Sequence, residues 1–511
     1  MKKIGIVIGL ALVLVACSVN PVTGKRELSF VGEDWELQVG QQQYSPGRQS
    51  QGGDYVADPA VQAYVNEVGQ RVAKVSDREL PYEFKVINSG VPNAWALPGG
   101  KIAINRGLLL ELNSEAELAA VLGHEVVHAA AKHGAKGFTR GALLQGGVLA
   151  ATVASAGKKY SNLAQVGANV GAQLVNTRYG RDAERESDRF GIEYMVRAGY
   201  DPQGAVELQR AFLKLSEGRR QDFISGLFAS HPPSAERVEN NEKIVAKLNV
   251  GGEVGRERYQ QNMRRLLRTE PAYEAYEDAQ KALADKDFNN ARALVRRAIS
   301  IEPNEGHFHS FLGDMEAESR NYRGALGHYD RAIALNDNFF YYHLQKGLAS
   351  EKVRDFRGAE RSLNRSVELL PTANAHNALG NIARVSGNRE AALSQYAKAA
   401  THQSPAGQAA LASMVDLDLP TNPGKYVASR PEVSQDGVVS ILVQNRTSRN
   451  LAGVSVAVRY PDANGQARET TGRVSGVLRA GTTERVTLRL RINPQFARQV
   501  QSAVTRASFA R

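Results

Sequence analysis

The string His124-Glu125-Val126-Val127-His128 decides how this 511-residue chain is interpreted. On a helix, positions four apart differ by only about 40° in direction, so His124 and His128 project from one face and can hold one metal ion. Glu125 lies beside that ion without binding it, where its carboxylate can take a proton from zinc-bound water. The spacing therefore predicts one Zn²⁺ per chain, with two histidine ligands and Glu125 as the catalytic base.

A catalytic zinc site needs a third protein ligand, and two side chains are candidates. His133 lies nine residues after His124, about 180° away around a helix expected to run from Ser114 to about His133, so we expect a surface or packing residue there. Glu184 lies in an acidic string on a separate downstream helix. Asp188, one turn later, can accept a hydrogen bond from a ligand histidine and fix its tautomer. We expect Glu184 as the third ligand and Asp188 as the support of a ligand histidine, the alternative being a solvated acidic helix face.

Further motifs accompany these residues in a fixed order. They are Asn93-Ala94-Trp95-Ala96-Leu97-Pro98-Gly99-Gly100, Arg106-Gly107-Leu108-Leu109, Glu184-Arg185-Glu186-Ser187-Asp188 and His231-Pro232-Pro233. Together with the histidine string they resemble the zinc metallopeptidase family that includes HtpX and the CAAX prenyl protease. The resemblance implies a mainly α, zincin-type domain with a small β-sheet, in which Glu184 is the third zinc ligand and Asp188 supports the ligands without binding the ion. Ser187 departs from the alanine usual in the family.

Two interpretations of His231 remain open. A histidine in a His-Pro-Pro loop that precedes a helix can simply pack against its neighbours. The family resemblance implies instead that this histidine can occupy the open position of the zinc ion and displace the catalytic water. His231 would then be a regulatory zinc ligand, because a catalytic zinc needs that position free.

The N-terminal sequence indicates export. Two lysines precede an apolar stretch that ends at Ala16 and is too short to cross a bilayer about 30 Å thick as a helix. Leu14-Val15-Ala16-Cys17 then resembles the bacterial lipobox, and Cys17 is the only cysteine of the chain. We expect a lipoprotein signal peptide over residues 1–16, lipidation at Cys17, and an N-terminal tether and extension over residues 17–50. An ordinary cleaved signal is the alternative.

The predicted peptidase domain covers residues 51–268. A strand-like run, Tyr82–Ile87, and a second short strand, Lys101–Asn105, are expected to join at a glycine turn. A Gly/Ala-rich apolar region follows between Gly141 and Val175. Polar residues such as Gln145 interrupt it, so buried or surface-lying helices are expected rather than a membrane span, which argues against a membrane-embedded peptidase.

A repeat with the tetratricopeptide period fills residues 269–420. Alanines recur at intervals of 34, 34 and 33 residues, at Ala291, Ala325, Ala359 and Ala392. Glycines recur in the same phase, at Gly313, Gly347 and Gly380. Small residues at fixed positions let paired helices approach closely, so we expect an α-solenoid of tetratricopeptide repeats.

After Pro420 apolar residues recur at every second position, as in β-strands with one buried face. This pattern predicts an antiparallel β-sandwich over residues 421–511. From Lys425 onward there are 14 basic and 5 acidic residues, so +9 of the net charge of +11 lies here. Arg485, Arg489 and Arg491 fall on one face of one strand. That face is either simply solvated or docks to an anionic surface, because arginine pairs well with phosphate.

Two functions are compatible with these features. The first is an endopeptidase that hydrolyses misfolded or misassembled envelope proteins; the second is a non-proteolytic chaperone or scaffold that binds such proteins through its repeats. The complete ligand set and Glu125 favour the first. Resemblance implies the periplasmic face of the outer membrane, from Ser18 after the lipobox, and the β-barrel assembly machinery as a partner. An exported protein meets no nucleic acid, so its anionic partners would be lipids.

Overall fold

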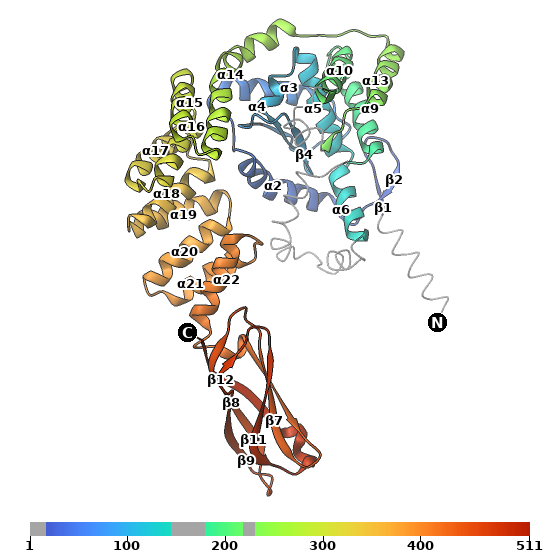
Figure 1. The fold of residues 1–511 in the computed structure, drawn as a ribbon. Coiled ribbons are helices and arrows are strands. Elements are labelled where there is room, and N and C mark those ends of the chain that lie inside the picture. Colours follow the sequence, from blue (N-terminus) through green and yellow to red (C-terminus); the bar gives the residue numbers. More distant parts are fainter. Residues whose placement is uncertain (1–16, 145–178, 218–229, 511) are drawn as a thin grey trace, which may run out of the picture. The chain divides into compact units, whose positions relative to one another are not determined.

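The computed structural model describes residues 17–144, 179–217 and 230–510, shown as a ribbon in Figure 1. The chain forms two compact units. The N-terminal unit comprises residues 1–349 and 368–370, and the C-terminal unit comprises residues 350–367 and 371–511. The predicted signal peptide and most of the Gly/Ala-rich region lie outside the described residues. None of the described helices has both the length and the apolar character needed to cross a membrane.

A three-stranded sheet and the helices around it form the first part of the N-terminal unit. Its elements are β1 (Cys17–Val19), β2 (Arg26–Leu28), α2 (Glu33–Ser50), α3 (Pro59–Ala73), β3 (Glu83–Ile87), β4 (Ala94–Leu97), β5 (Lys101–Asn105), α4 (Arg106–Leu109), α5 (Glu115–Ala130), α6 (His133–Leu144), α9 (Arg181–Arg197), α10 (Gln203–Glu217) and α13 (Ala235–Leu248). Asp58 caps α3 by accepting a hydrogen bond from the Ala60 amide, as its sequence Asp-Pro suggests.

The sheet contains one strand more than the sequence indicated. The strand order is β3-β5-β4, with β3 parallel and β4 antiparallel to β5. The expected glycine turn therefore joins β4 to β5, and Gly99 and Gly100 both have positive φ angles, of 78° and 82°. Strand β4 escaped prediction because all four of its residues are buried, so it shows no alternation of polar and apolar positions.

Helix α5 carries the histidine string through the middle of this unit. The Ser114 hydroxyl accepts a hydrogen bond from the Glu117 amide, which confirms the expected start of the helix. Every residue of α5 except His124 is buried. Helices α3, α9 and α10 pack against it, which fixes the direction in which its side chains point.

The end of α5 differs from the sequence-based expectation. The helix stops at Ala130 rather than near His133, and Lys132 adopts a left-handed conformation with φ of 60°. His133 instead begins α6, so the chain changes direction between the two helices. The 180° separation expected for His133 assumed one continuous helix and therefore does not hold.

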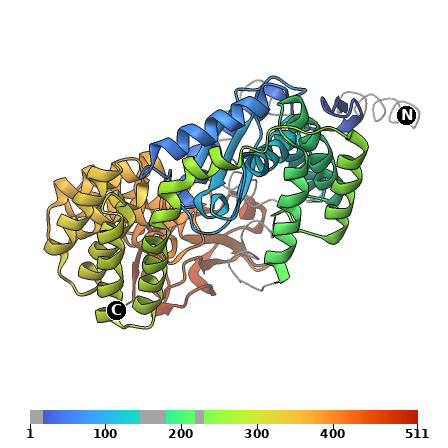
Figure 2. The same cartoon turned by 90° about the horizontal axis from the view of Figure 1, so that it is seen from above.

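Residues 17–50, expected to be an N-terminal tether and extension, contain regular structure packed onto the unit. Strands β1 and β2 pair antiparallel, and the Phe30 amide donates to the Thr139 hydroxyl of α6. At the other end of α2, the Gln49 side-chain amide bonds Asn338 and Phe340 in the repeats. Figure 2 shows α2, in blue, running toward the yellow-green helices.

Paired helices at the predicted period follow. They are α14 (Arg256–Ala284), α15 (Phe288–Ile301), α16 (Gly306–Glu318), α17 (Tyr322–Leu335), α18 (Phe340–Lys352), α19 (Phe356–Leu369), α20 (Ala373–Val385), α21 (Arg389–Ala400) and α22 (Pro405–Asp418). All four periodic alanines are fully buried. A Cβ on Gly313 would lie 2.6 Å from the Tyr329 ring, which explains the glycine. The tetratricopeptide-like repeats are confirmed, and α14 runs through the predicted boundary at residue 269.

The C-terminal unit ends in β-sheets, as the alternation predicted. The elements are η2 (Pro423–Lys425), β6 (Val427–Val433), β7 (Val438–Asn445), β8 (Leu451–Pro461), β9 (Ala467–Arg473), β10 (Val477–Leu478), β11 (Thr483–Arg491), η3 (Pro494–Gln499) and β12 (Gln501–Phe509). One sheet has the order β11-β7-β6; in the other, β8 pairs with β9, β10 and β12. All pairings are antiparallel, and residues of both sheets share one apolar core.

Candidate metal centre

Four side chains from three segments converge on one point in the N-terminal unit. His124 and His128 come from α5, Glu184 from α9, and His231 from the loop before α13. One ligand atom from each lies within 4.8 Å of the other three. The Nε2 atoms of His124 and His128 are 3.0 Å apart, and Nδ1 of His231 is 3.3 Å from His124 Nε2 and 3.0 Å from Glu184 Oε1.

The approach of α9 to α5 depends on two glycines. A Cβ on Gly191 would lie 3.2 Å from the His124 amide nitrogen, and one on Gly123 would lie 3.2 Å from the Gly191 carbonyl oxygen. Gly191 follows Glu184 by seven residues, so both fall on the same face of α9. Small residues at this crossing therefore bring the Glu184 carboxylate to the two histidines.

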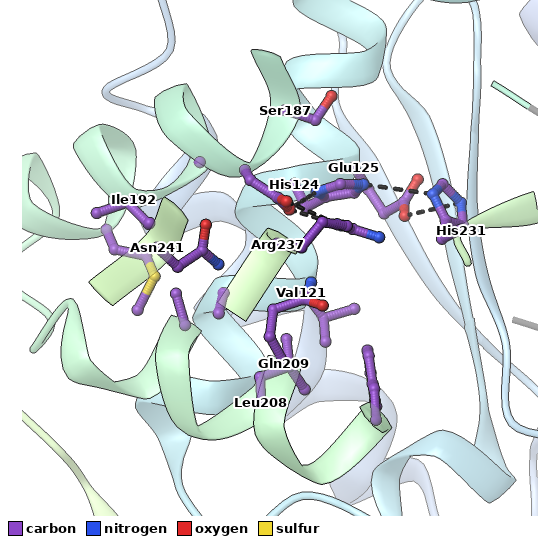
Figure 3. Close-up of a pocket in the computed structure, with 16 residues that line it drawn as sticks. Val121, His124, Glu125, Ser187, Ile192, Leu208, Gln209, His231, Arg237 and Asn241 are labelled. Atoms are coloured by element: carbon purple, nitrogen blue, oxygen red, sulfur yellow. Dashed lines mark hydrogen bonds and ion pairs between the residues drawn. The ribbon is translucent and has the colours of Figure 1, made fainter. Parts of the chain in front are cut away.

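Asp188 lies beside His124, on the side of the ring that faces away from the other cluster residues. Its Oδ1 is 3.0 Å from His124 Nδ1, the ring nitrogen that faces away from the cluster. Arg237 of α13 donates to both oxygens of this carboxylate, at 2.7 and 2.6 Å, and its Nη1 is 3.1 Å from Glu184 Oε2. The guanidinium thus holds two acids of α9 in place. Figure 3 shows it beside His124.

His133 is not a surface residue, contrary to one of the two expected positions. It is 3% exposed, and its Nδ1 is 2.9 Å from His128 Nδ1. The turn at Lys132 makes this contact, because it carries the chain back toward the preceding helix. Tyr179 stacks on the His128 ring with centroids 3.9 Å apart. His128 is therefore held from two sides.

Glu125 and His231 face each other, as Figure 3 shows. Glu125 Oε1 is 3.6 Å from His231 Nε2. Among the described residues, neither Glu125 Oε2 nor His231 Nε2 has a hydrogen-bond partner, although both atoms are buried. Burial raises the pKa of Glu125, which suits a carboxylate that must accept a proton near neutral pH.

The electrostatics of two cluster residues, Glu184 and His128, suit metal ligands. Burial alone would raise the pKa of Glu184, but His231 and His124 together hold it well below its usual range. Burial lowers the pKa of His128 well below its usual range. An ionised carboxylate and a neutral imidazole are the forms that bind a metal ion.

The residues present fit a zinc ion. Three imidazole nitrogens and one carboxylate are a donor set that Zn²⁺ accepts. Tetrahedral ligands about 2.0–2.2 Å from zinc would lie roughly 3.3 Å from one another. The separations of 3.0 to 3.5 Å between these donor atoms agree with that arrangement.

Sequence reasoning missed Arg237 and Tyr179. Arg237 lies three residues after the helix cap Ser234, where a charged residue is ordinary. Tyr179 precedes its helix in an irregular segment and belongs to no motif. The local sequence at either position carries no signal for the site; their roles come from contacts with distant residues.

Residues 59–245, which include the whole cluster, match Peptidase family M48. The chain is 31% identical to the mitochondrial metalloendopeptidase OMA1 of Schizosaccharomyces pombe over 45% of its own length and 67% of that protein. It is 32% identical to the metalloprotease LoiP of Escherichia coli, over 31% of this chain and 61% of LoiP.

Other relatives are matched over shorter shares of their length. The chain is 31% identical to the beta-barrel assembly-enhancing protease of Yersinia pestis, over 29% of this chain and 32% of that protein. It spans 36% of a similar protein of Vibrio cholerae. The matches confirm the family resemblance found in the sequence motifs. With its cluster of histidines and glutamate in the matched segment, the chain belongs to Peptidase family M48.

Proposed function

We propose that the protein is a zinc-dependent endopeptidase of the zincin type. The observation that carries this proposal is the cluster of His124, His128 and Glu184, of which His128 and Glu184 are buried, with the buried Glu125 carboxylate beside it. Zn²⁺, when bound there, polarises a peptide carbonyl and makes water a better nucleophile. His124, His128 and Glu184 would hold the ion, and Asp188 orients His124.

Glu125 is the group that moves protons in this proposal. Its carboxylate accepts the proton of the attacking water and later gives it to the leaving amine. Burial excludes competing water from this side chain. Because Glu125 binds no metal in this scheme, replacing it should separate metal binding from chemistry.

The test compares two variants of neighbouring residues. Glu125→Gln should retain one zinc per chain and lose peptide cleavage, whereas His124→Ala should lose both zinc and cleavage. Zinc is measured by elemental analysis of the purified protein, and cleavage with an unfolded casein-like substrate. Equal cleavage by wild type and Glu125→Gln would overturn the peptidase proposal.

His231 supports a second element of the proposal, a latch on the site. Its Nδ1 lies within hydrogen-bond distance of His124 and Glu184, so it would be a fourth ligand and leave no open position for water. His231→Ala should then raise basal proteolysis at unchanged zinc content. Activity equal to or below that of wild type would leave His231 as a packing or catalytic support.

The cellular setting is proposed from the sequence and from relatives. The lipobox at Cys17 favours a lipoprotein on the periplasmic face of the outer membrane, with misfolded envelope proteins as substrates. The names of two relatives favour the β-barrel assembly machinery as a partner. Crosslinking in cells with the Glu125→Gln variant, followed by identification of the trapped proteins, tests both; recovery of cytoplasmic proteins alone would contradict the setting.

Binding without proteolysis is the second candidate function. A groove of about 660 Å³ lies between the first repeat helices and the β5–α4 region. Four carboxylates outnumber two basic side chains in its lining, and three aromatic or imidazole rings accompany them. The acids are Glu111, Glu270, Glu274 and Glu277, the bases Arg106 and Lys281, and the rings Tyr273, Tyr276 and His307. This acidic surface would suit a cationic segment of polypeptide. Full function of Glu125→Gln in cells would favour binding over cleavage, with the C-terminal β-sandwich as a further docking module.

A further inference from the structure

The two histidines of α5 are supported in different ways. His124 Nδ1 faces a carboxylate directly, that of Asp188 at 3.0 Å. His128 Nδ1 faces another imidazole, that of His133, at 2.9 Å. Metal-binding histidines usually donate their second ring nitrogen to a carboxylate or a carbonyl oxygen, so an imidazole in this place needs a partner of its own.

That partner is Glu186, two residues after the cluster glutamate on α9. Its Oε1 is 3.3 Å from His133 Nε2. The same oxygen accepts a hydrogen bond of 2.8 Å from the side-chain amide of Asn20. Four side chains thus form one continuous series from the N-terminal strand to the metal cluster, namely Asn20, Glu186, His133 and His128.

The directions of these hydrogen bonds are mutually consistent. His128 presents Nε2 to the cluster, so in its neutral form Nδ1 carries the proton and donates to His133 Nδ1. His133 must then carry its own proton on Nε2, which donates to the Glu186 carboxylate. Each ring has one tautomer that satisfies both of its nitrogens, and the carboxylate accepts at the end of the series.

Asn20 belongs to a segment that is fixed to the same unit by other contacts. It is fully buried, and its Oδ1 accepts from the amides of Val22 and Thr23 in the turn between β1 and β2. The Glu27 carboxylate of β2 lies 2.5 Å from Lys136 of α6. Figure 1 shows β1 and β2 beside α6. The segment that follows Cys17 is therefore ordered against α6 and α9 and contacts the residues around the cluster.

We propose that His133, Glu186 and Asn20 are positioning residues that fix the tautomer and orientation of His128, so that the strand following Cys17 helps to set the metal affinity of the site. The proposal rests on the proposed function, because it takes His128 as a ligand. Partners of this kind typically contribute about 10- to 100-fold to metal affinity.

The test uses the full chain and measures zinc affinity by competition with a chelator. His133→Ala and Glu186→Ala should weaken zinc binding by about 10- to 100-fold, and Glu186→Gln by less, because its Oε1 can still accept from His133. Asn20→Asp keeps the acceptor for the β1–β2 turn but places a carboxylate against Glu186, and should weaken binding a few-fold. Glu193→Gln is the matched control, since Glu193 lies on the same helix and pairs with Arg189 at the surface.

Cobalt substitution supplies the readout that a purely structural role would not change. The visible absorption of the Co²⁺-loaded protein should shift in the His133, Glu186 and Asn20 variants and stay the same in Glu193→Gln, with thermal unfolding recorded in parallel. If wild type binds neither zinc nor cobalt, the proposed function fails. Suppose that wild type binds zinc and cleaves peptide, but these variants match Glu193→Gln in zinc affinity and in the cobalt spectrum. The positioning role of His133, Glu186 and Asn20 is then overturned, while the proposed function stands.

Discussion

Charged side chains gather in two regions of the molecule, and their surroundings differ. At the candidate metal centre, Glu125, Glu184 and Arg237 are buried, and the guanidinium of Arg237 contacts the two acids Asp188 and Glu184 of α9. On β11, Arg485 and Arg491 are 56% and 74% exposed and pair with acids at the surface. Buried charges need specific partners, so they define geometry. Exposed charges are screened by water and salt, so they act mainly through their summed field.

Breaking the Arg237 contacts should have the largest effect on the free energy of unfolding and on zinc affinity. Arg237→Ala would leave Asp188 and Glu184 buried without their cation, which typically costs about 3–5 kcal/mol. We expect a lower free energy of unfolding and weaker zinc binding, measured by denaturant titration and chelator competition.

The matched control is Arg185→Ala. Arg185 pairs with Glu236 in solvent, so its loss should leave both quantities near the wild-type values. Equal effects of the two substitutions would remove the distinction between buried and exposed charge in this unit.

Asp314 on α16 extends the comparison to a buried acid outside the cluster. Burial raises its pKa to about 6, although hydrogen bonds from Tyr329 and Tyr341 oppose the shift. The folded state then binds a proton at Asp314 more tightly than the unfolded state does. The contribution of this proton to the free energy of unfolding is therefore complete below about pH 4 and is lost as pH rises to 6.

Asp314→Asn should abolish this loss and stabilise the protein above pH 6, by about 3 kcal/mol from a shift of about two pKa units. Denaturant titrations between pH 4 and 8 would measure it. Asp330→Asn, which removes an exposed partner of Lys346, is the control. A stability profile that is the same for Asp314→Asn and wild type would contradict the assignment.

Two glycines at equivalent repeat positions, one in each unit, allow the stability of the two units to be tested separately. A methyl group on Gly313 or Gly380 would press on a tyrosine ring, at 2.6 and 2.5 Å. Overpacking of this kind costs about 1–3 kcal/mol. Gly313→Ala should lower the unfolding midpoint of the N-terminal unit and Gly380→Ala that of the C-terminal unit.

Calorimetry would show which transition moves, and Gly327→Ala, which meets no atom within 4 Å, should move neither downward. A single transition shifted alike by Gly313→Ala and Gly380→Ala would show that the two units unfold together.

The exposed arginines should give the smallest effect on stability. Replacing Arg485, Arg489 and Arg491 together by serine should leave thermal unfolding unchanged, because their side chains point to solvent. If the arginine face docks to an anionic surface, the variant should bind anionic vesicles more weakly, and wild-type binding should fall as salt rises. Absence of vesicle binding by wild type at low salt would leave these arginines as a solubilising face.

The sequence by itself determined the features that depend on local spacing. The interval of four in His124 and His128, the cap at Ser114 and the 34-residue recurrence of alanine each follow from helix geometry. They led to the peptidase family and the repeats, and to Glu184 and Asp188, which the structure brings to the two histidines. Apolar residues at every second position likewise indicated the C-terminal strands.

Only the tertiary structure decided which other side chains complete the site. Asn20 and Glu186 are 166 residues apart, and Arg237 lies 49 residues from Asp188. No local pattern records such pairs, because they form only when helix packing brings distant segments together. The role of His133 depended on a single backbone conformation at Lys132. Extending the helix by its period placed His133 on the far side, whereas the observed turn brings its ring to His128.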